Sequence, residues 1–405
     1  MRLFAENRSD FESCIDESFA SETSIVSRYR NVFKFDDCVE KDLVFKQCLL
    51  ECSIREGERV VSLMDYKGVN VHILDETSCM ATGSLKSIDG CLTTSLCCME
   101  AAERVAFESG GNTGTALTRY GRKSGLETFF FCPIENLDLL DSELFDGRRG
   151  HLIGVKDRGR VKELAGFFAK TARIRHIPDT SWRYVAAMFR GLFILEHMFA
   201  VRKYDWISQT ISAGFGPIGI YNVLKAFQND IHGVPRFLGV QQEANCPMFA
   251  AWKPDAVDPV DKIWKEDGKL LTRVMYDDSP QTYKTSDDFH QLLSSTNGDL
   301  LTVNENEFNA YIDTDAEYGR ILELLLSRGI SISLRSGQVI EKTGVIALVG
   351  TLKAIDAGLI EAGNTVLCCL TSGVTEADGR ALPEMTVQNT QDILEYIKNH
   401  VQKIP

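Results

Sequence analysis

The chain has 405 residues and a formal net charge of -13. A surface this acidic repels nucleic acid and anionic lipid, so neither is an expected partner. Apolar residues make up 44% and charged residues 25%, a composition that excludes disordered and fibrous proteins. At this length one compact core is unusual, so we expect two joined lobes.

The N-terminus and the most apolar stretch indicate whether the protein is secreted or inserted into a membrane. The first ten residues lack an apolar core and a small-residue cleavage site, so they do not resemble a secretory signal. The stretch 185–201 contains Arg190, Glu196 and His197, and is too short and too charged to span a bilayer. We therefore expect a cytoplasmic protein that does not enter the membrane.

Twelve cysteines are scattered along the chain. Cys48 and Cys52 stand four residues apart, but no second pair follows at the spacing of a zinc site. We expect reduced, buried cysteines that act as small apolar residues, and no metal site.

Strand-like apolar runs alternate with helix-like segments from about residue 60 onward. In the first half we expect strands at 69–74, 127–132, 151–155 and 174–177, and helices at 90–107 and 184–202. In the second half we expect strands at 206–211, 236–241 and 364–370, and helices at 217–228, 318–327, 344–357 and 388–402. The last helix is amphipathic, with one apolar face formed by Ile393, Leu394, Ile397 and Val401.

This alternation predicts an α/β protein of two lobes, each a mostly parallel twisted sheet with helices on both faces. We expect residues 1–65 and 195–405 to form the larger lobe, and residues 66–194 the smaller one.

The first candidate motif is Thr-Gly-Ser-Leu-Lys at 82–86, between an expected strand and an expected helix. Lys86 would project from a helix start at the mouth of a sheet, a suitable place for a nucleophilic amine. Taken alone, the motif is more often an exposed lysine at a helix start.

The second motif is Ser-Gly-Gly-Asn-Thr-Gly at 109–114, directly before the helical segment 116–122. Backbone N–H groups and the positive end of the helix would favour a carboxylate or a phosphate there. A tight turn with Asn112 as the helix cap is the alternative.

The third motif is Ser-Ala-Gly-Phe-Gly-Pro-Ile-Gly at 212–219, a candidate phosphate loop between a strand and a helix. Its glycines also fit the G-x-G-x-x-G spacing of dinucleotide-binding folds, with Glu243 after the next strand. A nicotinamide-dependent Rossmann dehydrogenase is therefore an alternative. Against it, the loop lies mid-chain, Pro217 removes one amide, and the first two motifs would have no role.

The fourth motif is Leu-Thr-Ser-Gly at 370–373, directly after an apolar strand. Ligands of parallel sheets bind at the carboxyl ends of strands, so Thr371 could donate a hydrogen bond to a ring nitrogen. A capped turn is the alternative.

Taken in this order, the motifs resemble the tryptophan-synthase-β-like (fold type II) pyridoxal-phosphate enzymes, and within them the threonine synthases. TGSLK resembles the cofactor-lysine motif, SGGNTGTAL the asparagine loop, SAGFGPIG the phosphate cup and CLTSG the ring-nitrogen motif. The stretch GVQQEANCPMFAAW resembles the cysteate synthases, which are relatives of this branch. The likeness spans roughly residues 69–380.

The resemblance implies pyridoxal 5'-phosphate as cofactor, bound as a Schiff base on Lys86. Asn112 would hydrogen-bond the cofactor's ring oxygen, and Thr371 its ring nitrogen. The backbone amides offered to the cofactor phosphate would be those of Gly214, Phe215, Gly216 and Gly219. The residues near the carboxylate of an amino-acid substrate would be Ser109, Gly110 and Thr113.

The implied function is β- or γ-replacement on an O-phosphorylated amino acid by a homodimer in amino-acid biosynthesis. It would be cysteate-synthase-like, using O-phosphoserine and sulfite or a similar nucleophile, or threonine-synthase-like. β-Elimination or dehydration is the alternative within the family. Threonine synthases usually follow the lysine with Asp-Arg, where this chain has Ser87 and Ile88, so leaving group and nucleophile stay open. Arg119, Arg122 and Lys123 could supply positive charge to a phosphate leaving group. The alternative is that they form an ordinary solvated helix end.

Overall fold

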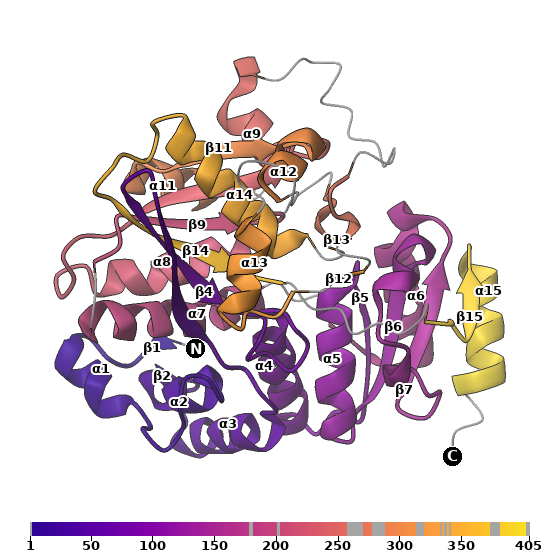
Figure 1. Cartoon of the computed structure of the whole chain (residues 1–405). Helices are drawn as coiled ribbons and strands as arrows, with labels where there is room; N and C mark the ends of the chain where they lie inside the picture. The colour runs from indigo at the N-terminus through magenta and orange to yellow at the C-terminus, as the bar shows by residue number, and fades with distance from the viewer. Residues whose placement is uncertain are drawn as a thin grey trace.

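A computed structural model describes residues 2–177, 181–200, 203–256, 270–277, 288–312, 320–332, 334–335, 338–339, 342–372 and 381–401. These residues form two mostly parallel sheets flanked by helices, which confirms the expected α/β fold class (Figure 1). Among them, no helix is long and apolar enough to cross a membrane.

The larger sheet has six strands in the order β11-β10-β9-β14-β4-β3, and every pairing except β3 with β4 is parallel. Its strands are β3 (Arg59–Tyr66), β4 (Val69–Asp75), β9 (Trp206–Thr210), β10 (Arg236–Gln242), β11 (Asp299–Val303) and β14 (Thr365–Leu370). The principal helices beside it are α7 (Ser181–Ala200), α8 (Phe215–Ala226) and α14 (Thr343–Asp356).

Strand β14 lies at the centre of this sheet and is buried on both faces. Leu367 and Cys369 belong to the apolar cluster that contains α7 and α8, whereas alternate residues from Val366 to Leu370 belong to the cluster that contains α14. A strand covered on both sides is a continuous apolar run, which explains why its sequence predicted it.

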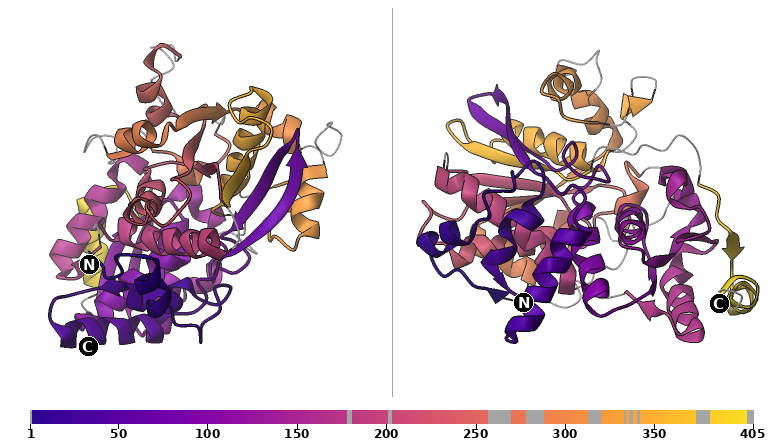
Figure 2. Two further views of the ribbon diagram at one scale, coloured as in Figure 1. Left: turned by 90° about the vertical axis from the view of Figure 1, so that its left-hand side faces the viewer. Right: turned by 90° about the horizontal axis from the view of Figure 1, so that it is seen from below.

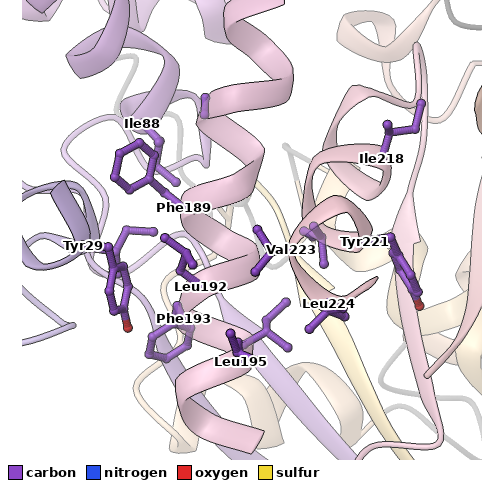
Figure 3. Packing of buried hydrophobic residues seen from close by; sticks show 14 of the residues in the cluster. Tyr29, Ile88, Phe189, Leu192, Phe193, Leu195, Ile218, Tyr221, Val223 and Leu224 are labelled. Carbon is purple, nitrogen blue, oxygen red and sulfur yellow. The ribbon is translucent and has the colours of Figure 1, made fainter. Parts of the chain in front are cut away.

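Helices α7 and α8 pack closely against each other on one side of the sheet (Figure 3). Leu192 and Leu195 of α7 and Val223 and Leu224 of α8 are fully buried. This helix pair holds the N-terminus of α8 in place, where the glycine-rich loop ends.

The smaller sheet has five parallel strands in the order β15-β7-β6-β5-β8. They are β5 (Arg104–Glu108), β6 (Glu127–Pro133), β7 (Gly150–Val155), β8 (Arg175–His176) and β15 (Met385–Val387). One face packs on α6 (Val161–Ala172) and α15 (Thr390–Tyr396), the other on α4 (Lys86–Met99) and α5 (Asn112–Lys123).

The remaining described elements lie mainly around the larger sheet. The N-terminal ones are β1 (Arg2–Leu3), α1 (Arg8–Cys14), α2 (Ile25–Tyr29), β2 (Phe33–Lys34) and α3 (Val39–Cys52), and they pack on α4 and α7. The later ones are α9 (Pro247–Trp252), α11 (Asp288–Thr296), α12 (Glu305–Ile312), α13 (Arg320–Ser327), β12 (Leu334–Arg335) and β13 (Gln338–Val339).

Two strands lie in a different sheet from the one that the expected lobe boundaries imply. Strand β4 was expected in the smaller lobe, but it lies in the six-stranded sheet between β14 and β3. Strand β15 was expected in the larger lobe, but it pairs with β7 of the five-stranded sheet. Figure 1 and the right-hand view of Figure 2 show the C-terminal segment on the outer side of the smaller sheet.

Two expected helices differ from the observed ones. The helix expected at 90–107 ends at Met99, because Ala101 adopts a positive φ of 52°, and residues 104–108 form strand β5 instead. In the C-terminal helix, Ile393, Ile397 and Val401 are buried as expected, whereas Leu394 is 41% exposed. Arg202 and residues 318–319, at the ends of two other expected helices, lie outside the described residues.

A buried ionic cluster fixes the C-terminal segment to the smaller sheet. His151 on β7 lies 2.8 Å from Glu384 through Nδ1 and 3.0 Å from Glu127 through Nε2. The Tyr396 hydroxyl on α15 also donates to Glu384, at 2.7 Å. Burial disfavours the charged imidazolium, but the hydrogen bonds and charges of the two carboxylates outweigh it and raise the pKa of His151 to about 9.

This cluster predicts a loss of stability on the alkaline side. The raised pKa means that folding binds a proton, so the stabilisation is complete below the unfolded pKa of about 6.5 and is lost as pH rises through about 9. The whole shift corresponds to roughly 3 kcal/mol. Urea unfolding of the wild type and of His151→Gln across that range should show a stability difference that shrinks as pH rises. A difference that stays constant with pH would contradict this assignment.

Candidate active site

The centre of the candidate site is the carboxyl edge of β4, β14 and β9, three adjacent strands of the larger sheet. Parallel sheets bind ligands at this edge. The chain leaves β4 toward Lys86, leaves β14 at Thr371 and leaves β9 into the glycine-rich loop. Three of the four sequence motifs therefore start from adjacent strand ends, and the fourth reaches them from the smaller sheet.

The Lys86 segment is held against the end of β14. Ser84 forms an antiparallel bridge with Ser372, and the Leu85 N–H donates to the Thr371 carbonyl oxygen at 2.9 Å. Lys86 is the first residue of α4, and its side chain is 29% exposed. Its Nζ lies 2.9 Å from the Asp89 carboxylate, one turn along the helix. The structure thus places Lys86 at a helix start on the sheet edge, as predicted.

Asn112 links the two sheets at the same strand end. It is the first residue of α5, and its Nδ2 donates to the Ser372 hydroxyl at 3.2 Å. Thr371 was predicted as a site residue from its motif, whereas Ser372 in the same motif was not. Thr371 is buried and contributes its carbonyl oxygen to the Lys86 segment. Gly373, the last residue of the motif, lies outside the described residues.

The residues expected near a substrate carboxylate lie in the turn before α5 and in its first turn. The Ser109 hydroxyl accepts from the Gly111 N–H at 3.1 Å, and the Gly110 carbonyl accepts from Asn136 at 2.6 Å. Gly111 has a φ of 153°, which favours glycine, and Thr113 is half-buried. These contacts place the three expected residues beside Asn112, and their role toward a carboxylate stays a prediction.

The glycine-rich loop forms the N-terminus of α8. Gly214 adopts a left-handed φ of 74° and caps the helix, and Phe215 and Gly216 are its first two residues. Their N–H groups belong to the helix end that lacks internal partners. Gly219 is one turn further on, where a Cβ would lie 2.5 Å from the Tyr184 carbonyl oxygen of α7. The structure therefore shows Gly219 at a helix–helix contact.

The surroundings of this loop fit a phosphate group. A Cβ on Gly216 would lie 2.8 Å from Arg190 Nη1 and 2.8 Å from Gln209 Nε2, so two buried donors approach the loop there. Arg190 Nη1 has no hydrogen-bond partner among the described residues. A helix N-terminus with a spare guanidinium N–H beside it is suited to an anion. The residues present thus fit the phosphate of the cofactor that the sequence resemblance implies.

A pocket of about 300 Å³ lies beside Asn112. Among its lining residues are Thr82, Gly83, Asn112, Thr115, Arg119 and Asp141. Lys86 and the glycine-rich loop do not line it.

Positive charge in this pocket comes from α5 and from the segment before β3. Arg119 donates to the Ala81 carbonyl at 2.9 Å and to Asp141 at 3.1 Å, and Arg55 lines the pocket as well. Of the three cations considered at the end of α5, only Arg119 lines the pocket. Arg122 pairs with Asp146, and Lys123 donates to a backbone carbonyl.

The structure offers no pattern of metal ligands among the residues that it describes, where no three His, Cys, Asp or Glu side chains are grouped as a metal site needs. All twelve cysteines are free thiols, and most of them are buried.

No family model matches the chain, and no curated protein matches its sequence. Its fold matches several solved structures. The processed form of threonine deaminase isoform 2 from Solanum lycopersicum is 15% identical with a TM-score of 0.57, over 85% of this chain and 92% of that one. An O-ureido-L-serine synthase is 14% identical with a TM-score of 0.55, over 80% and 91%. The diaminopropionate ammonia lyase from Escherichia coli is 11% identical with a TM-score of 0.58, over 89% and 93%. At these identities the likeness shows the fold.

Proposed function

We propose that the chain is a pyridoxal-phosphate enzyme that replaces the β- or γ-substituent of an O-phosphorylated amino acid. One observation carries the proposal. The segment that ends in Lys86 and the side chain of Asn112 both contact the 371–372 strand end, beside the strand that leads into the glycine-rich loop. Four motifs with no individual specificity thus converge on one sheet edge, in a fold shared with amino-acid lyases and synthases.

In this proposal each of the converging residues has a distinct role toward the cofactor or the substrate. Lys86 would hold the cofactor covalently, and its amine would then take the substrate's α-proton and return it. Asn112 and the hydroxyls of Thr371 and Ser372 would orient the cofactor ring, and the N-terminus of α8 would hold its phosphate. When bound, the cofactor withdraws electrons from the substrate's α-carbon.

The pocket beside Asn112 supports an anionic substituent on the substrate. Arg119 and Arg55 supply positive charge, and Thr82 and Thr115 supply hydroxyls, against the single carboxylate of Asp141. In the cysteate-synthase-like version, the bond from Cβ to the phosphate oxygen breaks, phosphate leaves, and sulfite forms the new bond at Cβ. In the threonine-synthase-like version, Cα and Cβ each lose a proton and phosphate leaves from Cγ, after which water forms the new bond at Cβ and protons return to Cγ and Cα.

A second candidate within the same chemistry is elimination. Two of the solved structures with this fold are described as a threonine deaminase and a diaminopropionate ammonia lyase. In that reaction the substituent leaves, water replaces the amino group, and a 2-oxo acid and ammonia are released. The dehydrogenase alternative would use Gly214 and Glu243, and the Glu243 carboxylate accepts from Asn304 at 3.3 Å. It gives Lys86 and Asn112 no part.

The test mixes cofactor-loaded protein with O-phosphoserine, O-phosphohomoserine, serine or threonine, with and without sulfite. Cysteate-synthase-like replacement predicts that phosphate release from O-phosphoserine requires sulfite, and threonine-synthase-like replacement predicts that O-phosphohomoserine gives phosphate and threonine with water alone. Elimination predicts equal amounts of phosphate, 2-oxo acid and ammonia without sulfite. Arg119→Met should raise KM for the phosphorylated substrates by about ten- to a hundredfold, and Arg122→Met should leave it unchanged. If no amino acid changes the cofactor spectrum, the proposal is wrong. Gel filtration of the same sample tests the proposed homodimer.

A further inference from the structure

Arg190 is a fully buried charge in the middle of the apolar helix α7. Its side chain is 1% exposed, and it lies between the end of β4 and the start of α8. Nε and Nη2 bind the two carboxylate oxygens of Glu76, and Nη2 also donates to Gln209 at 2.8 Å. The third nitrogen, Nη1, is buried and has no hydrogen-bond partner among the described residues. The guanidinium is thus held by one edge, with the other edge toward the glycine-rich loop.

A second carboxyl group lies in the same cluster. Glu58 is fully buried, and burial together with the negative charge of Glu76 raises its pKa well above the usual range. Both effects favour the uncharged form of Glu58, whereas Glu76 is the carboxylate that binds Arg190 directly. A buried guanidinium N–H without a hydrogen-bond partner lowers stability. Because Nη1 lies beside a helix N-terminus, an anion bound there would satisfy both groups.

We propose that Arg190 is a positioning residue for the cofactor phosphate, with Nη1 supplying a charged hydrogen bond at the side of the loop where Gly216 leaves room. The glycine-rich loop would thus be a charged site and not only a set of backbone amides. This rests on the proposed function and deepens it, because it makes the phosphate of pyridoxal phosphate a main determinant of cofactor choice. The Glu76 carboxylate, which binds the other edge of the guanidinium, lowers the net positive charge offered to the phosphate.

The test compares the Kd of pyridoxal 5'-phosphate with the Kd of pyridoxal, which lacks the phosphate. Arg190→Gln should lower the preference for the phosphorylated form by about ten- to a hundredfold, the value of one charge-assisted hydrogen bond. Glu76→Gln should raise the preference, because it removes the opposing negative charge. Glu58→Gln is the matched control, since it alters the same buried cluster but leaves the contacts of Arg190 with Glu76 and Gln209 in place, and it should leave the ratio unchanged. Phosphorus NMR of the bound cofactor gives a second readout that does not depend on catalysis.

Opposite effects of Arg190→Gln and Glu76→Gln would support the proposal, because general damage to the buried cluster would weaken both variants alike. If Arg190→Gln does not fold, the rise in Glu76→Gln and the unchanged Glu58→Gln still decide the question. An unchanged preference in folded Arg190→Gln, or a fall in Glu76→Gln, would overturn the proposal. These results differ from failure of the proposed function, in which the wild type binds neither form of the cofactor.

Discussion

Lys86→Ala is expected to abolish covalent binding of pyridoxal phosphate completely. The Lys86 segment is fixed by the Ser84–Ser372 bridge and by the hydrogen bond from Leu85 to Thr371, so the lysine starts α4 at one defined place on the sheet edge. A lysine elsewhere cannot replace it. Lys123→Ala is the control, because Lys123 lies at the far end of α5 and donates to the Ser53 carbonyl.

The measurement is the absorption spectrum of the purified protein, followed by borohydride reduction and peptide mapping. The wild type and Lys123→Ala should show a band near about 410–420 nm, the range of a Schiff base between this cofactor and a lysine, and Lys86→Ala should not. Reduction should label the peptide that contains Lys86. A colourless wild type that takes up no added cofactor would rule out the leading proposal, and binding of a nicotinamide dinucleotide would then become the next measurement.

Much of the larger sheet could be predicted because its central strands are apolar on both faces. Strand β14 and strand β9 each lie within a residue or two of their expected bounds. Two of the motifs could be placed for the same reason, since the glycine-rich loop follows β9 and the Thr371 motif follows β14. Strand β5 could not be separated from the helix before it, because its apolar residues continue a helical pattern and the break depends on the backbone of Ala101.

Contacts between residues far apart in the chain could not be predicted from the sequence. Asn112 and Ser372 are 260 positions apart, and their hydrogen bond forms only because β14 places its end beside α5. Arg190 and Glu76 are 114 positions apart, and in the sequence the arginine indicated only that its apolar stretch does not span a membrane. A charged residue in an apolar helix signals a buried partner, but one sequence does not say which.

The structure gives Gly219 a packing role that the sequence did not predict. The resemblance of its motif to a phosphate cup implies that its backbone amide faces the cofactor phosphate, and that role stays a prediction. In the structure, a Cβ at this position would lie 2.4 Å from the Ala187 side chain and 2.5 Å from the Tyr184 carbonyl oxygen. Both atoms belong to α7, and neither is the end of a flexible side chain. Gly219 thus allows the close packing of α7 and α8 that Figure 3 shows.

Gly219→Ala is therefore expected to lower the free energy of unfolding by about 3 kcal/mol, because the added methyl must push two packed helices apart. Gly166→Ala in α6 is the matched control. Its Cβ would meet its nearest neighbour at 3.7 Å, so a gain of about 0.5–1 kcal/mol is expected from the higher helix propensity of alanine. Denaturant unfolding of both variants measures these changes.

The same pair of helices carries Arg190 and the start of α8, so a displaced α8 should also weaken cofactor binding in Gly219→Ala. That loss should affect pyridoxal phosphate and leave pyridoxal nearly unchanged, since under the proposal only the phosphate would contact the loop. Wild-type stability in Gly219→Ala would contradict the packing argument. Wild-type stability together with weaker binding of the phosphorylated form would instead support the direct contact between Gly219 and the cofactor phosphate that the sequence resemblance implies.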